Sequence, residues 1–280
     1  MRILHPTDFS KTAAKALSLA RDLKDRLGGE LHVAHVQSRF HEGLSGVRLR
    51  PQLDSVNPKV DQSLETERAD EARRLREMLA HIASPDATTE LRWGEPIREL
   101  LDMQDDYDLV VMGAHGSNRF DSYFLGGVAG RFVRRSRVPV ITVREEFEVT
   151  PVERVLVATD FSVASTAAVA LAEKFGAAGI KRVLCHVIDD SRFKEDPGYI
   201  NTVTDSLSLI DDNGAYERHV IRSGDPAEVL PAVAREVGAE IVVIGLKRQR
   251  GAVGLLLGSR VDALIRSSHV PVLSVPGSDG

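Results

Sequence analysis

Ile3-Leu4-His5-Pro6-Thr7-Asp8-Phe9-Ser10 is a short apolar run that ends in Thr-Asp-Phe-Ser, and it recurs as Leu156-Val157-Ala158-Thr159-Asp160-Phe161-Ser162. Four further matches follow in the same order: His35-Val36 with His186-Val187, Gly94-Glu95-Pro96 with Gly224-Asp225-Pro226, Asp108–Gly113 with Glu240–Gly245, and Val138-Pro139-Val140 with Val270-Pro271-Val272. Chance does not produce five matches in one order, so the chain of 280 residues is a tandem repeat of two units, each of ordinary domain size.

The repeat predicts two domains, residues 1–146 and 147–280. Their boundary falls in Arg144–Glu153, a charged stretch that contains Pro151 and lies between two predicted strands. The distance from the His-Val block to the Gly-Glu-Pro or Gly-Asp-Pro block is about 20 residues shorter in the second copy. The first copy therefore carries an insertion there, Ser38–Lys59. This insertion is long and aperiodic, which leaves two alternatives open: a mobile lid near a cleft or a disordered surface excursion.

Each copy alternates predicted strands with predicted helices. The expected strands are Arg2–Thr7, Leu31–Val36, Thr88–Arg92, Leu109–Met112 and Val140–Val143 in the first copy, and Arg154–Thr159 and Val272–Val275 in the second. After the first strand, helical spacing places six side chains on one face of a helix that Gly28-Gly29 ends: Ala13, Ala16, Leu17, Ala20, Leu23 and Leu27. Further helices are expected over Val60–Ile82, from Pro96, and from near Gly126-Gly127. This alternation predicts an α/β fold with two tandem doubly wound domains, in which helices cover both faces of a parallel sheet.

Composition limits the function classes. No apolar run reaches the roughly 18 residues of a membrane span, and the N-terminus reads as a strand and not as a signal peptide. The net charge of −5 argues against nonspecific nucleic-acid binding. Cys185, the single cysteine, lies in an apolar run and is expected to be a buried, inert thiol. We therefore expect a soluble cytoplasmic protein that needs neither a membrane nor a nucleic acid.

Three segments are expected to meet where the strands end. Pro6-Thr7-Asp8 leaves the first strand, Val36 ends the second, and Met112–Gly116 leaves the fourth. The carboxyl ends of parallel strands share one edge of the sheet, where ligands bind in such folds. A glycine-rich loop that leads into a helix at Gly126-Gly127 presents free backbone N–H groups and suits a phosphate. A carboxylate such as that of Asp8 accepts hydrogen bonds from an adenine or a ribose.

Each of these features also has a purely structural interpretation. Asp8 and Ser10 are residue types that cap a helix. The glycines that follow the fourth strand suit a tight turn between strand and loop. His115 has no second metal ligand nearby in the sequence and fits a solvent-exposed loop, whereas His35 and His186 fit packing near strand ends.

The full order of these motifs resembles the universal stress protein family: Pro-Thr-Asp-Phe-Ser, His-Val, Met-Gly-Ala-His-Gly, then Gly-Gly-Val nine residues later, and Val-Pro-Val-Ile-Thr-Val. The resemblance covers nearly the whole chain as a tandem pair. It implies a five-stranded parallel sheet in each domain, an adenine-nucleotide α-hydrolase-like arrangement, and ATP held in the cleft in the nucleotide-binding branch of the family. It places adenine and ribose contacts on Pro6, Thr7, Asp8, Val36 and Met112, and phosphate contacts on Gly113, His115, Gly116, Gly126, Gly127, Val128 and Ala129. The matching positions in the second half are Thr159, Asp160, Val187, Gly245, Gly258 and Ser259.

Both copies depart from the family pattern. The first has Gly127 where serine or threonine is usual, so one hydroxyl for the terminal phosphate is lost. The second has Arg248 in place of a glycine, within the basic run Lys247–Arg250. An arginine there fills space that phosphates would use, although the run also suits an anion or a solvated surface.

The leading hypothesis is a regulatory stress-response module that binds ATP, ADP or AMP, with or without Mg, chiefly in the N-terminal half. The sequence contains no phosphate loop with the Gly-x4-Gly-Lys pattern and no spacing typical of metal ligands. We therefore expect that the protein is not an enzyme and has no catalytic residue and no metal site. Slow hydrolysis of bound ATP stays compatible with the sequence. The alternative is a nucleotide-free scaffold that acts through protein–protein contacts. A third reading, an adenylating enzyme, lacks the required Ser-Gly-Gly-x-Asp-Ser loop. The last strands of the two copies are expected to pair in an intramolecular pseudo-dimer, and homodimers of the whole chain stay open.

Overall fold

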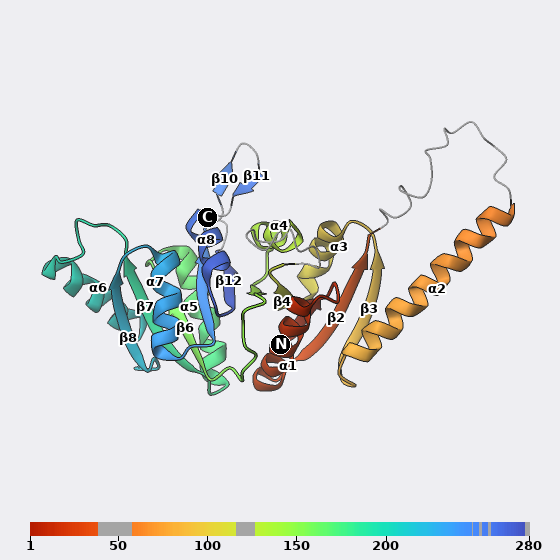
Figure 1. The fold of residues 1–280 in the computed structure, drawn as a ribbon. Helices are drawn as coiled ribbons and strands as arrows, with labels where there is room; N and C mark the ends of the chain where they lie inside the picture. The colour runs from red at the N-terminus through yellow and green to blue at the C-terminus, as the bar shows by residue number, and fades with distance from the viewer. Residues whose placement is uncertain (39–57, 116–126, 248, 252–253, 257–258, 278–280) are drawn as a thin grey trace.

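The computed structural model describes residues 1–38, 58–115, 127–247, 249–251, 254–256 and 259–277 (Figure 1). The first half contains β1 (Arg2–Pro6), α1 (Lys11–Leu27), β2 (Glu30–Gln37), α2 (Pro58–Ile82), β3 (Thr88–Trp93), α3 (Pro96–Met103) with a 3-10 turn (Gln104–Asp106), β4 (Leu109–Gly113), α4 (Gly127–Arg135) and β5 (Val140–Val143). The second half contains β6 (Arg154–Ala158), α5 (Val163–Ala177), β7 (Lys181–Ile188), α6 (Pro197–Ile210), β8 (Arg218–Ser223), α7 (Pro226–Val237), β9 (Ile241–Leu246), β10 (Gln249–Gly251), β11 (Gly254–Leu256), α8 (Ser259–Ser267) and β12 (Val272–Pro276).

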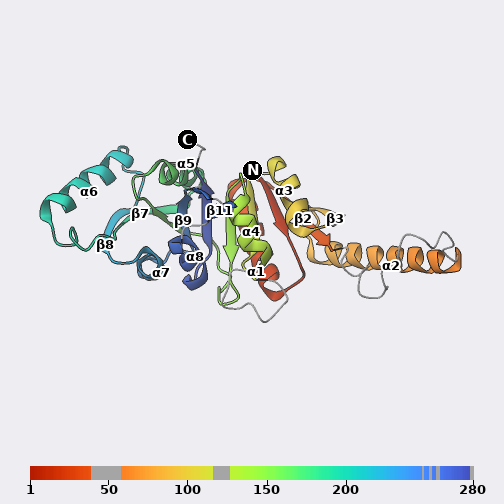
Figure 2. The same ribbon diagram turned by 90° about the horizontal axis from the view of Figure 1, so that it is seen from above.

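One sheet of ten strands runs through both halves, in the order β3-β2-β1-β4-β5-β12-β9-β6-β7-β8. Within each half the five strands pair in parallel. The prediction of a parallel five-stranded sheet flanked by helices in each half is confirmed. From above, α2 and α6 lie at opposite ends of the molecule (Figure 2).

The two faces of the sheet carry separate hydrophobic cores. Side chains of α1, α2, α5 and α6 pack on one face, and side chains of α3, α4, α7 and α8 pack on the other. Each core includes residues of both halves. Cys185 belongs to one of them and is fully buried, so its expected burial is confirmed, and that burial raises the pKa of its thiol to about 12.

Helix α1 forms where the sequence predicts it. The Ser10 hydroxyl accepts a hydrogen bond from the backbone N–H of Ala13 at 3.1 Å and caps the first turn. Gly28 ends the helix with a φ of 62°, a left-handed conformation that glycine adopts without a steric penalty. Of the six side chains expected on its inner face, five are buried: Ala13, Ala16, Leu17, Ala20 and Leu23. The local capping residues and the apolar spacing therefore agree on this element.

The halves meet through their last strands. β5 and β12 pair in antiparallel orientation, with Ile141 opposite Leu273. These are the two strands that were expected to pair, and the pairing removes the exposed edge that each would otherwise present. On one face of this junction the Arg134 guanidinium of α4 lies 3.5 Å from the Asp262 carboxylate of α8.

The connecting segment between the halves packs against α1. Phe147 and Val152 are buried in the core, although the sequence marked their surroundings as a charged boundary. The Lys15 ammonium donates to the backbone carbonyls of Glu145 and Phe147, the latter at 2.7 Å. The Asp22 carboxylate accepts a hydrogen bond from the Val152 backbone N–H at 2.9 Å. This segment is therefore attached to the first half and is not a free linker.

Other details differ from expectation. The first strands of the halves end one residue early, at Pro6 and Ala158. The second half also contains an antiparallel hairpin, β10–β11, that the sequence did not predict. Most of the insertion Ser38–Lys59, and with it the lid hypothesis, lies outside the described residues. Among the described helices, none is long and apolar enough to cross a membrane.

Candidate functional site

The predicted segments of the first half meet at one edge of the sheet. β1 lies between β2 and β4, and all three strands run in the same direction, so their carboxyl ends are neighbours. The Thr7 backbone N–H donates to the Ala34 carbonyl at 2.8 Å, which holds the chain against β2 just beyond the last residue of β1. Pro6, Thr7, Asp8, Val36, Met112 and Gly113 are therefore brought together at this edge, as the sequence predicts.

The turn Thr7–Ser10 is built from its own side chains. The Thr7 hydroxyl accepts a hydrogen bond from the Phe9 backbone N–H, and the Asp8 carboxylate accepts one from the Ser10 backbone N–H, both at 3.0 Å. Phe9 has a φ of 61°, a left-handed conformation that costs a non-glycine residue about 1 kcal/mol. The capping interpretation is correct for Ser10, and Asp8 keeps its carboxylate exposed at the strand edge.

His35 supports this turn from β2. Its Nδ1 donates to the Thr7 carbonyl at 2.7 Å, and its ring centroid lies 4.7 Å from that of Phe9. Because His35 is 8% exposed, its predicted packing near a strand end is confirmed. Its Nε2 lies 3.1 Å from Oε1 of Gln37, whose amide nitrogen in turn donates to Glu71 on α2 at 2.9 Å. The strand edge is therefore connected to α2 by side chains.

The residues of β4 take part mainly through their backbone. Met112 is 4% exposed, so its side chain belongs to the core. A Cβ atom on Gly113 would lie 3.2 Å from the backbone nitrogen of Ala13, because the start of α1 packs directly on the end of β4. Glycine here serves this close approach, which is a packing role different from the tight turn that the sequence suggested.

The start of α4 faces none of the other described residues closely. Gly127 is the first helical residue, it is exposed, and a Cβ atom there would meet no described residue within 4 Å. Val128 and Ala129 complete the first turn, whose N–H groups have no partner inside the helix. His115 lies beyond β4 and is half-buried with both ring nitrogens buried, so the interpretation as a solvent-exposed loop histidine is wrong. The predicted phosphate residues Gly116 and Gly126 lie outside the described residues.

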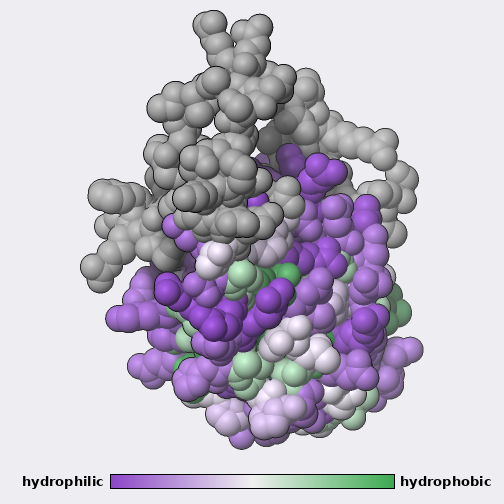
Figure 3. All heavy atoms as spheres, turned by 90° about the vertical axis from the view of Figure 1, so that its right-hand side faces the viewer, coloured by the Kyte–Doolittle hydropathy of each residue, from purple (hydrophilic) through white to green (hydrophobic). Residues whose placement is uncertain are grey.

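A cavity of about 720 Å³ adjoins Thr7 on the other side of the turn, between α1 and α2. Phe9, Leu17, Met78 and Ile82 supply most of its apolar lining. The surface seen from the α2 end is mostly hydrophilic, with hydrophobic side chains in small patches (Figure 3). In the part of the chain that the structure describes, no group of three His, Cys, Asp or Glu side chains gathers to hold a metal ion.

The second half repeats the turn. The Thr159 carbonyl accepts from His186 Nδ1 at 2.8 Å, and the Thr159 hydroxyl accepts from the Phe161 backbone N–H at 3.1 Å. Phe161 has a φ of 60° and stacks on the His186 ring at 4.7 Å between centroids. His186 is 6% exposed, which confirms its expected packing, and Val187 is half-buried beside it. Burial lowers the pKa of His186, while the hydrogen bond to Thr159 acts in the opposite direction.

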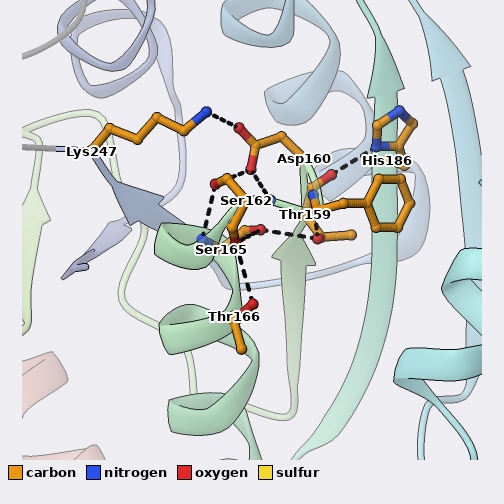
Figure 4. A network of polar contacts seen from close by, with 8 residues as sticks. Thr159, Asp160, Ser162, Ser165, Thr166, His186 and Lys247 are labelled. Carbon is orange, nitrogen blue, oxygen red and sulfur yellow. Dashed lines mark hydrogen bonds and ion pairs between the residues drawn. The ribbon is translucent and has the colours of Figure 1, made fainter. Parts of the chain in front are cut away.

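A lysine side chain holds the Asp160 carboxylate. The Lys247 ammonium, just beyond β9, lies 2.9 Å from Asp160 Oδ2, and Oδ1 accepts from both the backbone N–H and the hydroxyl of Ser162 (Figure 4). Burial would raise the pKa of Asp160, but these hydrogen bonds outweigh it and lower the pKa to about 2. The carboxylate is therefore ionised and paired across the strand edge.

The glycine positions of the second half are less informative. A Cβ atom on Gly245 would lie 2.2 Å from the Ala164 carbonyl oxygen, so this glycine is required for α5 to pack against β9. Ser259 begins α8, whereas Gly258 and Arg248 lie outside the described residues. The sequence did not identify Lys247 as a site residue. The repeat offered the available signal, because Lys247 aligns with His115. Each of the two residues lies two positions after the matching glycine, Gly245 or Gly113.

Comparison with known proteins agrees with this architecture. The sequence pattern of the universal stress protein family matches residues 1–144 and 151–276. A universal stress protein of Mycobacterium tuberculosis (strain H37Rv) is 29% identical over 221 residues, which cover 73% of each chain. The crystal structure of a universal stress protein from Archaeoglobus fulgidus DSM 4304 superposes with a TM-score of 0.69 at 25% identity, covering 99% of this chain and 98% of the other. This protein therefore belongs to the universal stress protein family.

Proposed function

We propose that the chain binds an adenine nucleotide at the carboxyl ends of β1, β2 and β4 in its first half, and that it acts as a regulatory stress-response module. The observation that carries this proposal is the meeting of Thr7-Asp8, Val36 and Gly113 at one strand edge, with α4 as the next described element of the chain. Parallel α/β sheets bind their ligands at this edge.

The residues present fit such a ligand. The exposed Asp8 carboxylate is an acceptor for an adenine amine or a ribose hydroxyl, and Val36 is a half-buried apolar neighbour for a base. The open first turn of α4 offers backbone N–H groups and a favourable dipole to phosphate. A bound nucleotide supplies negative charge and a planar base, and the chain supplies the donors and acceptors that orient them.

Nucleotide bound during expression offers the direct test. The purified protein is denatured, and the supernatant is resolved by anion exchange. Recovery of close to one ATP, ADP or AMP per chain supports the proposal. Recovery of none, together with an unchanged melting temperature in millimolar Mg-ATP, supports the nucleotide-free scaffold instead.

A thermal comparison makes the test specific for the first half. A ligand present at 100 times its dissociation constant stabilises its domain by about 2.7 kcal/mol, so the melting temperature rises by a few degrees. Asp8→Ala is expected to lose most of this rise. Asp160→Ala, the matched variant in the second copy, is expected to keep it. Repeating the measurement with EDTA shows whether Mg contributes to the affinity.

A further inference from the structure

The Asp160–Lys247 pair joins two separate segments of the second half. Asp160 follows β6 and Lys247 follows β9, two neighbouring strands of the sheet, so the pair bridges the strand edge (Figure 4). The ammonium lies 2.9 Å from Oδ2, the carboxylate oxygen that Ser162 does not use. A ligand amine or hydroxyl that approached this oxygen would therefore have to compete with a cation.

The carboxylate is held firmly in this position. The Ser162 hydroxyl, which contacts Asp160, also caps α5 by accepting from the Ser165 backbone N–H at 3.3 Å. The Thr159 hydroxyl lies 3.1 Å from the Ser165 hydroxyl, and the Thr159 carbonyl accepts from His186. Thr159 and Ser162, on either side of the Asp160-Phe161 pair, are thus both held by hydrogen bonds, and the two bonds from Ser162 orient the Asp160 carboxylate.

The repeat shows what is particular to the second half. Thr159-Asp160-Phe161-Ser162 reproduces the first turn in sequence, in the left-handed phenylalanine and in its backbone hydrogen bonds, and in both halves the histidine ring of the next strand lies 4.7 Å from the phenylalanine ring. At the end of the equivalent strand, however, His115 of the first half is replaced by Lys247. The binding carboxylate is thus present in both halves, and a lysine stands beside it in the second.

We propose that Lys247 weakens adenine-nucleotide binding in the second half, by competing for the Asp160 carboxylate that the base or ribose would use. This inference rests on the proposed function of the first half, carried over to the matching carboxylate of the second half. The side chains of Asp160 and Lys247 are 57% and 62% exposed, so water and salt screen the pair. Its release is therefore worth about a fivefold gain in affinity, equivalent to about 1 kcal/mol.

The experiment isolates the second site in the full-length chain. The first site is disabled by Asp8→Ala, and Mg-ATP is titrated by calorimetry. Adding Lys247→Met, which keeps the length of the side chain and removes its charge, is expected to tighten second-site binding about fivefold. Adding Lys247→Arg, which keeps the charge, is the matched control and is expected to give no gain. Circular dichroism melts check that each variant folds.

The outcomes separate this inference from the proposed function. If the gain persists after Asp160→Asn is added to Lys247→Met, the carboxylate is not the contested group and the inference fails. It also fails if adding Lys247→Met to the Asp8→Ala chain does not tighten Mg-ATP binding, and a chain in which no binding is detected counts as this outcome. Weaker binding after Lys247→Met would mean that the ammonium holds phosphate, and the inference would then fail as well. A wild-type chain whose first site binds nothing overturns the proposed function instead, whatever the second site does.

Discussion

Replacing His5 by valine is predicted to remove a large part of the acid sensitivity of the first half. His5 lies on β1 with its side chain fully buried. Its Nδ1 donates to the Val111 carbonyl at 2.8 Å, and its Nε2 has no hydrogen-bond partner among the described residues. Burial lowers the pKa of His5 to about 4, although the bond to Val111 opposes that shift. Valine is chosen as the replacement because Val157 occupies the position of the second half that matches His5.

The sign follows from proton linkage. The pKa of an exposed histidine in the unfolded chain is about 6.5, so between pH 6.5 and pH 4 the unfolded chain binds a proton that the folded chain excludes. The free energy of unfolding therefore falls as the pH drops through this window and is unaffected above it. With these two pKa values, the loss between pH 7.5 and pH 5 is about 2 kcal/mol.

Urea unfolding at pH 7.5 and pH 5 measures this loss. Trp93, the single tryptophan, lies on β3 and reports on the first half by fluorescence. Burial also lowers the pKa of His32, His186 and His269, but their contributions cancel when the two proteins are compared. The wild type is expected to lose about 2 kcal/mol more than His5→Val over this interval. Equal losses in the two proteins would refute the account of His5 as a buried neutral side chain.

Three further predictions concern the glycines and the junction. Gly127→Ser restores the hydroxyl of the family pattern at a position where a Cβ atom meets no described residue within 4 Å. It is expected to tighten Mg-ATP binding by up to about tenfold in calorimetry. Unchanged or weaker binding would argue against phosphate at α4. Gly245→Ala places a Cβ atom 2.2 Å from the Ala164 carbonyl oxygen and is expected to cost about 1–3 kcal/mol in urea unfolding, whereas Gly127→Ala, the control in open space, is expected to cost much less. Because β5 pairs with β12 and Lys15 holds the connecting segment, small-angle scattering is expected to show one compact particle, and two independently moving bodies would contradict the intramolecular pseudo-dimer.

Much of the fold was predictable because its signals are local and repeated. The Ser10 cap, the left-handed Gly28 and the apolar face of α1 are all encoded within one helix and its flanks. The burial of Phe147 and Val152 was not predictable in this way. Their neighbours are charged, and what buries them is contact with α1, far away in the sequence.

The candidate site was predictable only in part. Strand order brings Asp8 and Gly113 together at one edge, and parallel topology makes that consequence general. The pairing of Lys247 with Asp160 depends instead on where two side chains point from separate strand ends, and the sequence gives only a basic run that is usually solvated. Gly113 and Gly245 showed the pattern of a phosphate site, yet Gly245 is also required for the close approach of α5, and a Cβ atom on Gly113 would make a tight contact with the start of α1.

The central claim is that one adenine nucleotide binds per chain, in the first half. Calorimetric titration of the wild-type chain with Mg-ATP, alongside Asp8→Ala and Asp160→Ala, tests it most directly. The account predicts a stoichiometry of about one, binding that is lost or strongly weakened by Asp8→Ala, and binding that survives Asp160→Ala. A site that survives Asp8→Ala and disappears with Asp160→Ala would contradict it, because the nucleotide would then occupy the second half, where Lys247 competes for the Asp160 carboxylate.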